Sequence, residues 1–154
     1  MSHEWRRGGY LVSTDRALLD IPLMHEFLST QTYWAINRPL ELIQKSVDNS
    51  LPFGLYKEGR QVGFARVVTD YATFGWLADV FILPAEQGKG LGTWLTECVL
   101  AHPDLQGFRR WLLATKDAHE IYRRLGFIEL SRPERFMERR DPNSTDQSDY
   151  WKTL

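Results

Sequence analysis

A glycine-rich corner between an apolar run and an amphipathic stripe constrains this chain more than any other feature. Residues 74–83 are almost wholly apolar, with Asp79 as the only charge, which is typical of a strand buried on both faces. After the corner at 84–92, apolar side chains recur with helical spacing. They are Leu91, Trp94, Leu95, Cys98 and Val99. The pattern predicts a buried strand that turns through glycines directly into a helix.

The corner has the chemistry of an anion site. The first backbone N–H groups of a helix have no partner within the helix, and the helix dipole places partial positive charge at the same end. Gly88, Gly90 and Gly92 carry no Cβ, so the backbone can adopt positive φ and approach a ligand closely. Lys89 adds a cation beside them. We therefore expect this corner to bind phosphate.

The spacing of the corner separates it from two common phosphate-binding loops. A Walker A loop needs Ser or Thr after its lysine, but Gly90 follows Lys89 here, and a dinucleotide fingerprint needs its glycines directly after the strand. The spacing that matches is Gln-x-x-Gly-x-Gly, formed by Gln87, Gly90 and Gly92. This motif resembles the acetyl-CoA pyrophosphate loop of the GNAT N-acetyltransferase superfamily. The alternative for an isolated motif of this kind is a tight turn with no ligand.

A second segment further along the chain strengthens this resemblance. Tyr122 follows Ala118 by four residues, and Gly126-Phe127 then ends the helix, as in the other signature of that superfamily. Tyr122 taken by itself would be interpreted as a packed core aromatic. Two motifs in this order and spacing favour the family.

Length and composition narrow the class of protein. The chain has 154 residues, enough for one domain with a sizeable core, and its formal charge of −1 and pI near 6.4 argue against a nucleic-acid-binding or membrane-binding surface. It has no apolar run long enough to span a membrane and no signal-like start, so we expect a cytoplasmic protein. The single cysteine, Cys98, excludes a disulfide within the chain and is expected in the core.

Periodicity gives an ordered set of elements. We expect strands at 10–13, 51–56, 61–69, 74–83, 109–115, 128–131 and 135–140, and helices after Asp20, at 38–48, after the glycine corner and around Tyr122. This order predicts a mixed α/β fold with a twisted sheet of about seven strands and helices on both faces. The GNAT resemblance covers residues 8–140, taken as the domain. Residues 141–154 are polar and are expected to form a flexible tail.

The resemblance implies where acetyl-CoA, the co-substrate, would bind. In that superfamily the central strand and the next parallel strand splay apart, and the pantetheine arm enters the cleft between them. By this analogy the backbone of Val80, Phe81 and Ile82 would pair with pantetheine. The pyrophosphate would be held by the loop residues Gln87, Gly88, Lys89, Gly90, Leu91, Gly92 and Thr93. No metal is implied.

The proton transfers that acetyl transfer requires suggest two catalytic residues. An alkylammonium acceptor with a pKa of about 10.4 must lose a proton, which costs about 4.6 kcal/mol at pH 7, and the departing thiolate benefits from a proton donor. Tyr122 is the expected donor. Asp79 is the expected base, because burial in an apolar strand raises the pKa of a carboxyl. Alternatively, Asp79 is a structural acid satisfied by the backbone or by an arginine such as Arg66.

The function implied is acetyl transfer from acetyl-CoA to a primary amine of a small molecule, by direct transfer in a ternary complex. Acids and aromatics near the expected pocket, including Tyr33 and Trp34, favour a cationic amine, although these two rings could equally pack between helices. A catalytically silent acyl-CoA-binding module is the main alternative. Arginines near 132–140 could serve nucleic acid, but interleaved acids indicate a solvated edge strand instead. A homodimer is left open.

Overall fold

Six strands form one mixed sheet in the computed structural model, which describes residues 1–146. The strands follow one another across the sheet in chain order, antiparallel from β1 to β5, with β6 parallel to β5. Their bounds are β1 Glu4–Arg7, β2 Tyr10–Ser13, β3 Leu51–Lys57, β4 Arg60–Thr69, β5 Phe74–Ile82 and β6 Arg110–Leu112. The mixed α/β class is confirmed, with one strand fewer than the approximate count expected.

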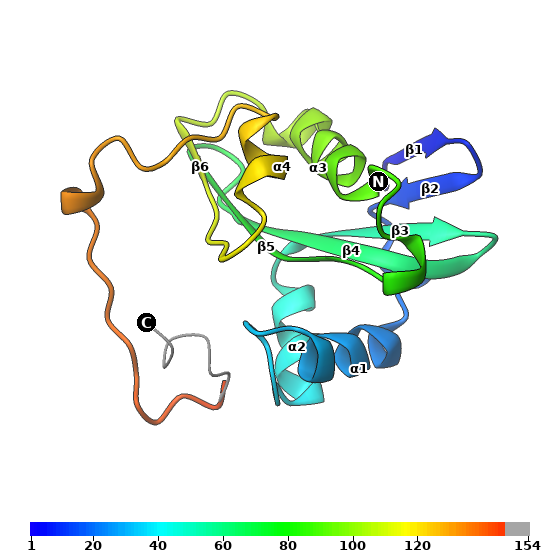
Figure 1. The fold of residues 1–154 in the computed structure, drawn as a ribbon, viewed down its shortest axis with the longest axis horizontal. Coiled ribbons are helices and arrows are strands. Elements are labelled where there is room, and N and C mark those ends of the chain that lie inside the picture. The colour runs from blue at the N-terminus through cyan, green and yellow to red at the C-terminus, as the bar shows by residue number, and fades with distance from the viewer. Residues whose placement is uncertain (147–154) are drawn as a thin grey trace.

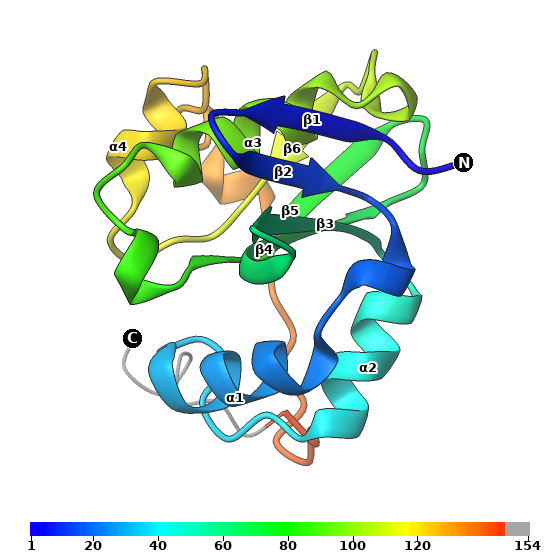
Figure 2. The same cartoon turned by 90° about the vertical axis from the view of Figure 1, so that its right-hand side faces the viewer.

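Helices cover both faces of this sheet, as predicted. α1 (Ile21–Gln31) and α2 (Leu40–Asp48) lie on one face, and α3 (Leu91–Ala101) and α4 (His119–Arg123) lie on the other (Figures 1 and 2). Asp20 caps α1, since its Oδ1 accepts a hydrogen bond from the Leu23 N–H at 3.1 Å. Short 3-10 turns at Arg16–Leu18, Pro84–Glu86, Pro103–Leu105 and Pro133–Arg135 complete the chain.

Two apolar cores lie on opposite faces of the sheet. One is built around the predicted stripe of α3, whose members Leu91, Trp94, Leu95, Cys98 and Val99 are all buried. The other joins α1 and α2 to the sheet through Met24, Leu28, Ile43, Phe64 and Phe81. The helical spacing read from the sequence therefore identified which side chains of α3 face the sheet.

A β-bulge in β5 places a charged residue between these two cores. Phe64 pairs with Phe81 and Arg66 pairs with Ala78, so two residues of β5, Asp79 and Val80, lie opposite one residue of β4. Asp79 has a φ of 54°, in the left-handed region that non-glycine residues rarely adopt. Because the extra residue shifts the alternation, Leu77 packs into the α3 core and Phe81 into the α1–α2 core.

The parallel pair of strands separates soon after it forms. β6 pairs only with Phe74–Trp76, and from Leu77 onward β5 has no strand beside it on that side among residues 1–146. The sheet therefore contains the splayed cleft that the resemblance implied. β6 is shorter than the expected strand at 109–115, because Leu113–Thr115 leave the sheet where the cleft opens.

The two ends of the fold differ from expectation. β1 was not predicted, although Gly8-Gly9, with φ of 51° and 86°, forms the two-residue turn of a β-hairpin with β2. The closing strands predicted at 128–131 and 135–140 are wrong, since neither segment pairs with a strand in the described part of the chain. Ile128 and Met137 are 79% and 98% exposed, so their alternating pattern is not supported by burial.

The segment after α4 runs past the β6 edge of the sheet toward the α1–α2 side, where Asp146 reaches Arg38 (Figure 1). Residues 147–154 of the predicted tail lie outside the described residues. Within residues 1–146, no helix has both the length and the apolar character needed to cross a bilayer.

Candidate active site

A cavity of about 300 Å³ opens where β5 and β6 part. Its walls come from the loop between α1 and α2, from β4 and β5, from the segment after β6 and from α4. Three of the predicted site residues, Asp79, Val80 and Tyr122, line it together. The other polar or aromatic side chains on its wall are Tyr33, Trp34, Arg38, Arg66, Trp76, Thr115, Asp117 and Asp146.

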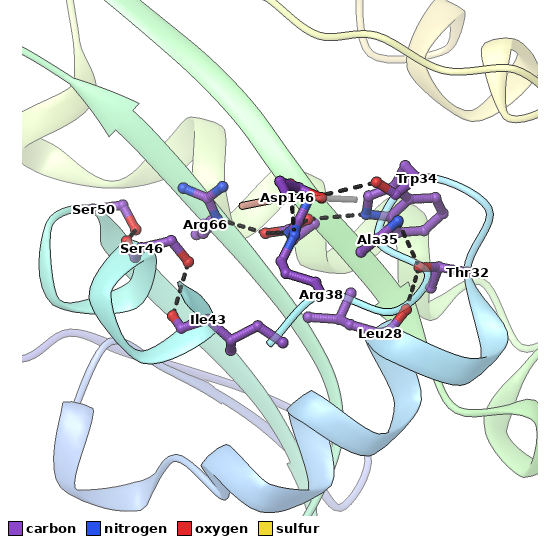
Figure 3. Close-up of polar contacts among 11 residues, drawn as sticks. Leu28, Thr32, Trp34, Ala35, Arg38, Ile43, Ser46, Ser50, Arg66 and Asp146 are labelled. Carbon is purple, nitrogen blue, oxygen red and sulfur yellow. Dashed lines mark hydrogen bonds and ion pairs between the residues drawn. The ribbon is translucent and has the colours of Figure 1, made fainter. Parts of the chain in front are cut away.

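Asp79 is the centre of a buried ion cluster. Its Oδ1 accepts hydrogen bonds from Trp34 Nε1 at 2.9 Å and Arg38 Nη1 at 3.0 Å, and its Oδ2 accepts from Arg66 Nε at 2.7 Å. Arg38 Nη1 also lies 3.1 Å from Oδ2. Figure 3 shows Trp34 and Arg66 approaching this cluster from opposite sides. The Asp79 side chain is only 4% exposed, so these donors replace the water that a carboxylate would otherwise bind.

This environment shifts the pKa of Asp79 in the direction opposite to the one expected. Burial alone would raise the pKa of the carboxyl, but the charges of Arg66 and Arg38 and their hydrogen bonds outweigh burial and hold the pKa below its usual range. The predicted raised pKa is therefore wrong, because the sequence revealed the burial and not the two cations. Asp79 is an ionised anion that orients two arginines, and it is poorly suited to accept a proton near neutrality.

Tyr122 presents a free hydroxyl to the same cavity. The residue is 9% exposed, and its ring packs edge-on against Phe127 with centroids 5.9 Å apart. Among residues 1–146 no hydrogen-bond partner lies within reach of the hydroxyl. Burial, helped by the charges of Tyr33 and Asp117, raises the pKa of Tyr122 to about 12. The side chain is therefore a neutral hydrogen-bond donor at physiological pH, while its role as proton donor stays a prediction.

The glycine corner has the geometry of an anion site. Gly88 and Gly90 have φ of 79° and 75°, and the first helical hydrogen bond of α3 runs from the Trp94 N–H to the Gly90 carbonyl at 3.1 Å. The backbone N–H groups of residues 88–93 have no acceptor within the described chain. A Cβ on Gly88 or Gly90 would meet nothing within 4 Å, so the positive φ, and not local crowding, is what requires glycine there.

Two polar side chains of the predicted loop are held by the protein itself. Gln87 Nε2 donates to the Ile82 carbonyl at 2.9 Å and ties the loop to the end of β5. Lys89 Nζ donates to Glu86 at 3.0 Å, and Glu86 also accepts from the Tyr10 hydroxyl. These hydrogen bonds, that of Tyr10 first, lower the pKa of Glu86 to about 2. Lys89 is therefore a partly neutralised cation, and the Glu86–Tyr10 link to β2 was not foreseen.

The remaining predicted site residues differ in whether their side chains lie in a core or line the cavity. Phe81 stacks on Phe27 with centroids 4.6 Å apart in the α1–α2 core, so only its backbone is available to a ligand. Leu91 is buried under the loop. Tyr33 and Trp34 both line the cavity, and the Tyr33 hydroxyl accepts from the Lys116 N–H at 2.7 Å. These two rings therefore form a wall of the pocket.

The sequence did not single out Arg38 or Asp146 as residues of the cavity. Arg38 was placed only at the start of a helix, and Asp146 in the tail, because an ion pair across 108 residues leaves no periodic signal. Together with Asp79 and Arg66 they give the cavity two cations and two anions. Among residues 1–146, no group of three or more His, Cys, Asp or Glu side chains could hold a metal ion.

Comparisons with known proteins agree with this geometry. A curated relative from Gibberella zeae, named "Putative acetyltransferase FG08082", is 36% identical over 140 residues, covering 77% of this chain and 78% of the relative. A crystal structure from Xanthomonas campestris pv. campestris, described as a "putative acetyltransferase belonging to the gnat family", has a TM-score of 0.85 and 52% identity. It covers 89% of this chain and 96% of that one.

A more distant structure shares the fold. It is a Mycobacterium tuberculosis protein solved in complex with CoA and NLQ, with a TM-score of 0.64 and 22% identity, covering 78% of this chain and 72% of that one. The family model described as the acetyltransferase (GNAT) family matches residues 21–127. The chain belongs to the GNAT family of acetyltransferases.

Proposed function

We propose that this protein is an acetyl-CoA-dependent N-acetyltransferase that moves an acetyl group to a primary amine of a small molecule, with both substrates bound at once. The observation that carries the proposal is one continuous path. The unpaired N–H groups of residues 88–93 lead along the open edge of β5 to the free hydroxyl of Tyr122. A fold neighbour solved with CoA supports the assignment of the cofactor.

The path suits the three parts of acetyl-CoA. The diphosphate is an anion that matches the N-terminus of α3, where donors and helix dipole coincide. The pantetheine arm carries amides that pair with the backbone of Val80, Phe81 and Ile82, which have no β6 partner. The thioester then lies in the cavity lined by Asp79, Val80 and Tyr122.

The reaction balances without a covalent enzyme intermediate. The neutral amine nitrogen attacks the thioester carbonyl carbon, the C–S bond breaks, and the coenzyme A thiolate leaves. The Tyr122 hydroxyl donates its hydrogen bond to the sulfur as negative charge develops there, and the extra proton on nitrogen passes to water. Because the pKa of Tyr122 lies above that of a thiol, its main contribution is stabilising the thiolate in the transition state.

This mechanism leaves Asp79 outside proton transfer. Both its oxygens are occupied by donors from Trp34, Arg38 and Arg66. Its role is to hold two arginines at the cavity wall. The acceptor amine is deprotonated by solvent, at a cost of about 4.6 kcal/mol at pH 7 for an ordinary alkylammonium.

A thiol-release assay with acetyl-CoA tests the proposal across amines, amino acids, aminoglycosides and peptides. The expected result is acceptor-dependent release of coenzyme A with a stoichiometric acetylated product. Tight binding of acetyl-CoA without transfer to any acceptor would instead identify a silent acyl-CoA-binding module. Failure to bind acetyl-CoA at all would refute both readings.

A further inference from the structure

A carboxylate of the protein's own C-terminal segment occupies the cavity. Asp146 Oδ2 lies 3.0 Å from both Nε and Nη2 of Arg38, so it fills the side edge of that guanidinium. Arg38 is 11% exposed, whereas Asp146 is 30% exposed and comes from a segment beyond the sheet and its helices. A buried cation of the pocket is thus paired with a more exposed anion.

Charge balance explains why an anion is needed at that place. Asp79 is shared between Arg38 and Arg66, so one carboxylate faces two guanidinium groups, all three of them at most 14% exposed. Without Asp146 this cluster carries one excess positive charge in a largely desolvated setting, which is unfavourable unless an anion or water compensates it. Whatever displaces Asp146 must therefore supply a negative group.

Arg66 adds donors that the protein leaves unused. It donates through Nε to Asp79, and in the part of the chain that the structure describes its terminal nitrogens Nη1 and Nη2 have no hydrogen-bond partner. Figure 3 shows these nitrogens pointing away from the ion cluster. Arg66 lines the cavity, so it presents further positive charge to a ligand there.

The cavity's acids, by contrast, are poorly placed to select a cation. Asp79 and Asp146 are both paired with arginine, which leaves Asp117 as the other acid on the wall. The sequence had favoured a cationic small amine. The arrangement of charges instead fits an acceptor with one amine and one carboxylate, since such a molecule satisfies Arg38 and still offers a nucleophile to the thioester.

We propose that the acceptor is an amino acid or a related amino-carboxylate, whose carboxylate takes the place of Asp146 on the Nε–Nη2 edge of Arg38. This inference rests on the proposed function, because it names the substrate class of that same site. The Asp146 carboxylate competes with the substrate until the acceptor displaces it. Guanidinium edges bind carboxylates through two parallel hydrogen bonds, which gives this site its selectivity over neutral groups.

Matched acceptors provide the first test. Amino-carboxylates of increasing length, together with α-amino acids, are compared with their own primary amides and with the amines that lack the carboxyl group. The proposal predicts a kcat/KM at least about tenfold higher for the carboxylate member of the preferred set, as for a charge-assisted hydrogen bond. Arg38→Gln should abolish this preference, so that the carboxylate and its amide have equal kcat/KM in that variant.

Asp146→Asn is the test that leaves all three buried side chains of the cluster, Arg38, Arg66 and Asp79, in place. Removing the competing charge should lower KM for the preferred amino-carboxylate by roughly two- to tenfold and leave KM for its amide unchanged. Asp141→Asn is the matched control, because Asp141 is an exposed carboxylate of the same segment that caps the Asn143 N–H. That control variant should behave as wild type.

Different results would overturn the carboxylate site at Arg38 and the acetyltransferase activity. Acetylation of amines with equal kcat/KM for carboxylates and amides, and no effect of Asp146→Asn, would overturn the carboxylate site and keep the acetyltransferase. If no acceptor is acetylated, calorimetry of the amino-carboxylates on the CoA-saturated protein decides the matter. Binding that Arg38→Gln abolishes upholds the carboxylate site without the proposed activity, and absence of binding overturns it.

Discussion

Replacing Asp79 by Asn tests the ion cluster at the cavity wall. The substitution keeps the size of the side chain and removes its charge, so the buried Arg66 loses its carboxylate partner and Arg38 keeps only the Asp146 carboxylate. Removing one partner of a buried ion pair typically costs about 3–5 kcal/mol, because an uncompensated charge remains. For a chain of this length that corresponds to a fall in Tm of roughly 6 to 20 °C.

Denaturant unfolding followed by circular dichroism measures this loss directly. Asp48→Asn, at the exposed end of α2, is the control and should change stability by less than about 0.5 kcal/mol. A double variant with Arg66→Gln also removes the cation that Asp79→Asn leaves without a carboxylate partner. The free energy of unfolding that the double variant loses should be smaller than the sum of the two single-variant losses by about 1 kcal/mol or more.

The pH dependence of stability gives a second readout of the same group. The folded pKa of Asp79 is lowered, so its stabilising contribution is fully present above the unfolded value of about 3.9 and is lost as pH falls toward the folded pKa. Wild type should lose stability in that acidic window, and Asp79→Asn should lack this component. A variant as stable as wild type, with the same acid transition, would refute the buried cluster.

Two further predictions concern the glycine corner and the core. Gly90→Val should abolish acetyl-CoA binding in calorimetry while circular dichroism shows a folded domain, because Gly90 caps α3 at a φ of 75° and its neighbours must approach the diphosphate; unchanged affinity would mean that the loop does not hold the phosphates. Burial, followed by the charge of Glu97, raises the pKa of Cys98 to about 12, so the native protein should give no signal with thiol reagents at pH 8. Rapid labelling of the folded protein would contradict the buried position of Cys98.

Local patterns in the sequence predicted the central part of the fold. The apolar run of β5, the positive-φ glycines and the stripe of α3 are consecutive in the chain, so spacing alone indicates a strand, a corner and a helix. Tyr122 was singled out by the resemblance of its segment to a family motif, and it lies on the short helix α4, which ends shortly before Gly126. Such signals depend on neighbours a few residues away, and they hold because the same contacts form in the fold.

Long-range pairs account for what the sequence could not show. The titration of Asp79 is set by Arg38 and Arg66, which are 41 and 13 residues away along the chain. The predictions of strands at 128–131 and 135–140 were wrong for a related reason. An alternating pattern forms a strand only if the edge of another strand is available for pairing. At the other end, the Gly8-Gly9 turn was a readable signal for β1 that the charged residues around Trp5 obscured.

Single-turnover acetyl transfer in the Tyr122→Phe variant tests the central claim most directly. The ring and its packing on Phe127 remain, so only the hydroxyl that faces the cavity is lost. A preorganised hydrogen-bond donor to a developing anion contributes about 10²- to 10³-fold, so the rate of transfer should fall by at least roughly the smaller factor, with acetyl-CoA affinity nearly unchanged. A variant that transfers acetyl at the wild-type single-turnover rate would show that Tyr122 is a core aromatic that does not stabilise the departing thiolate.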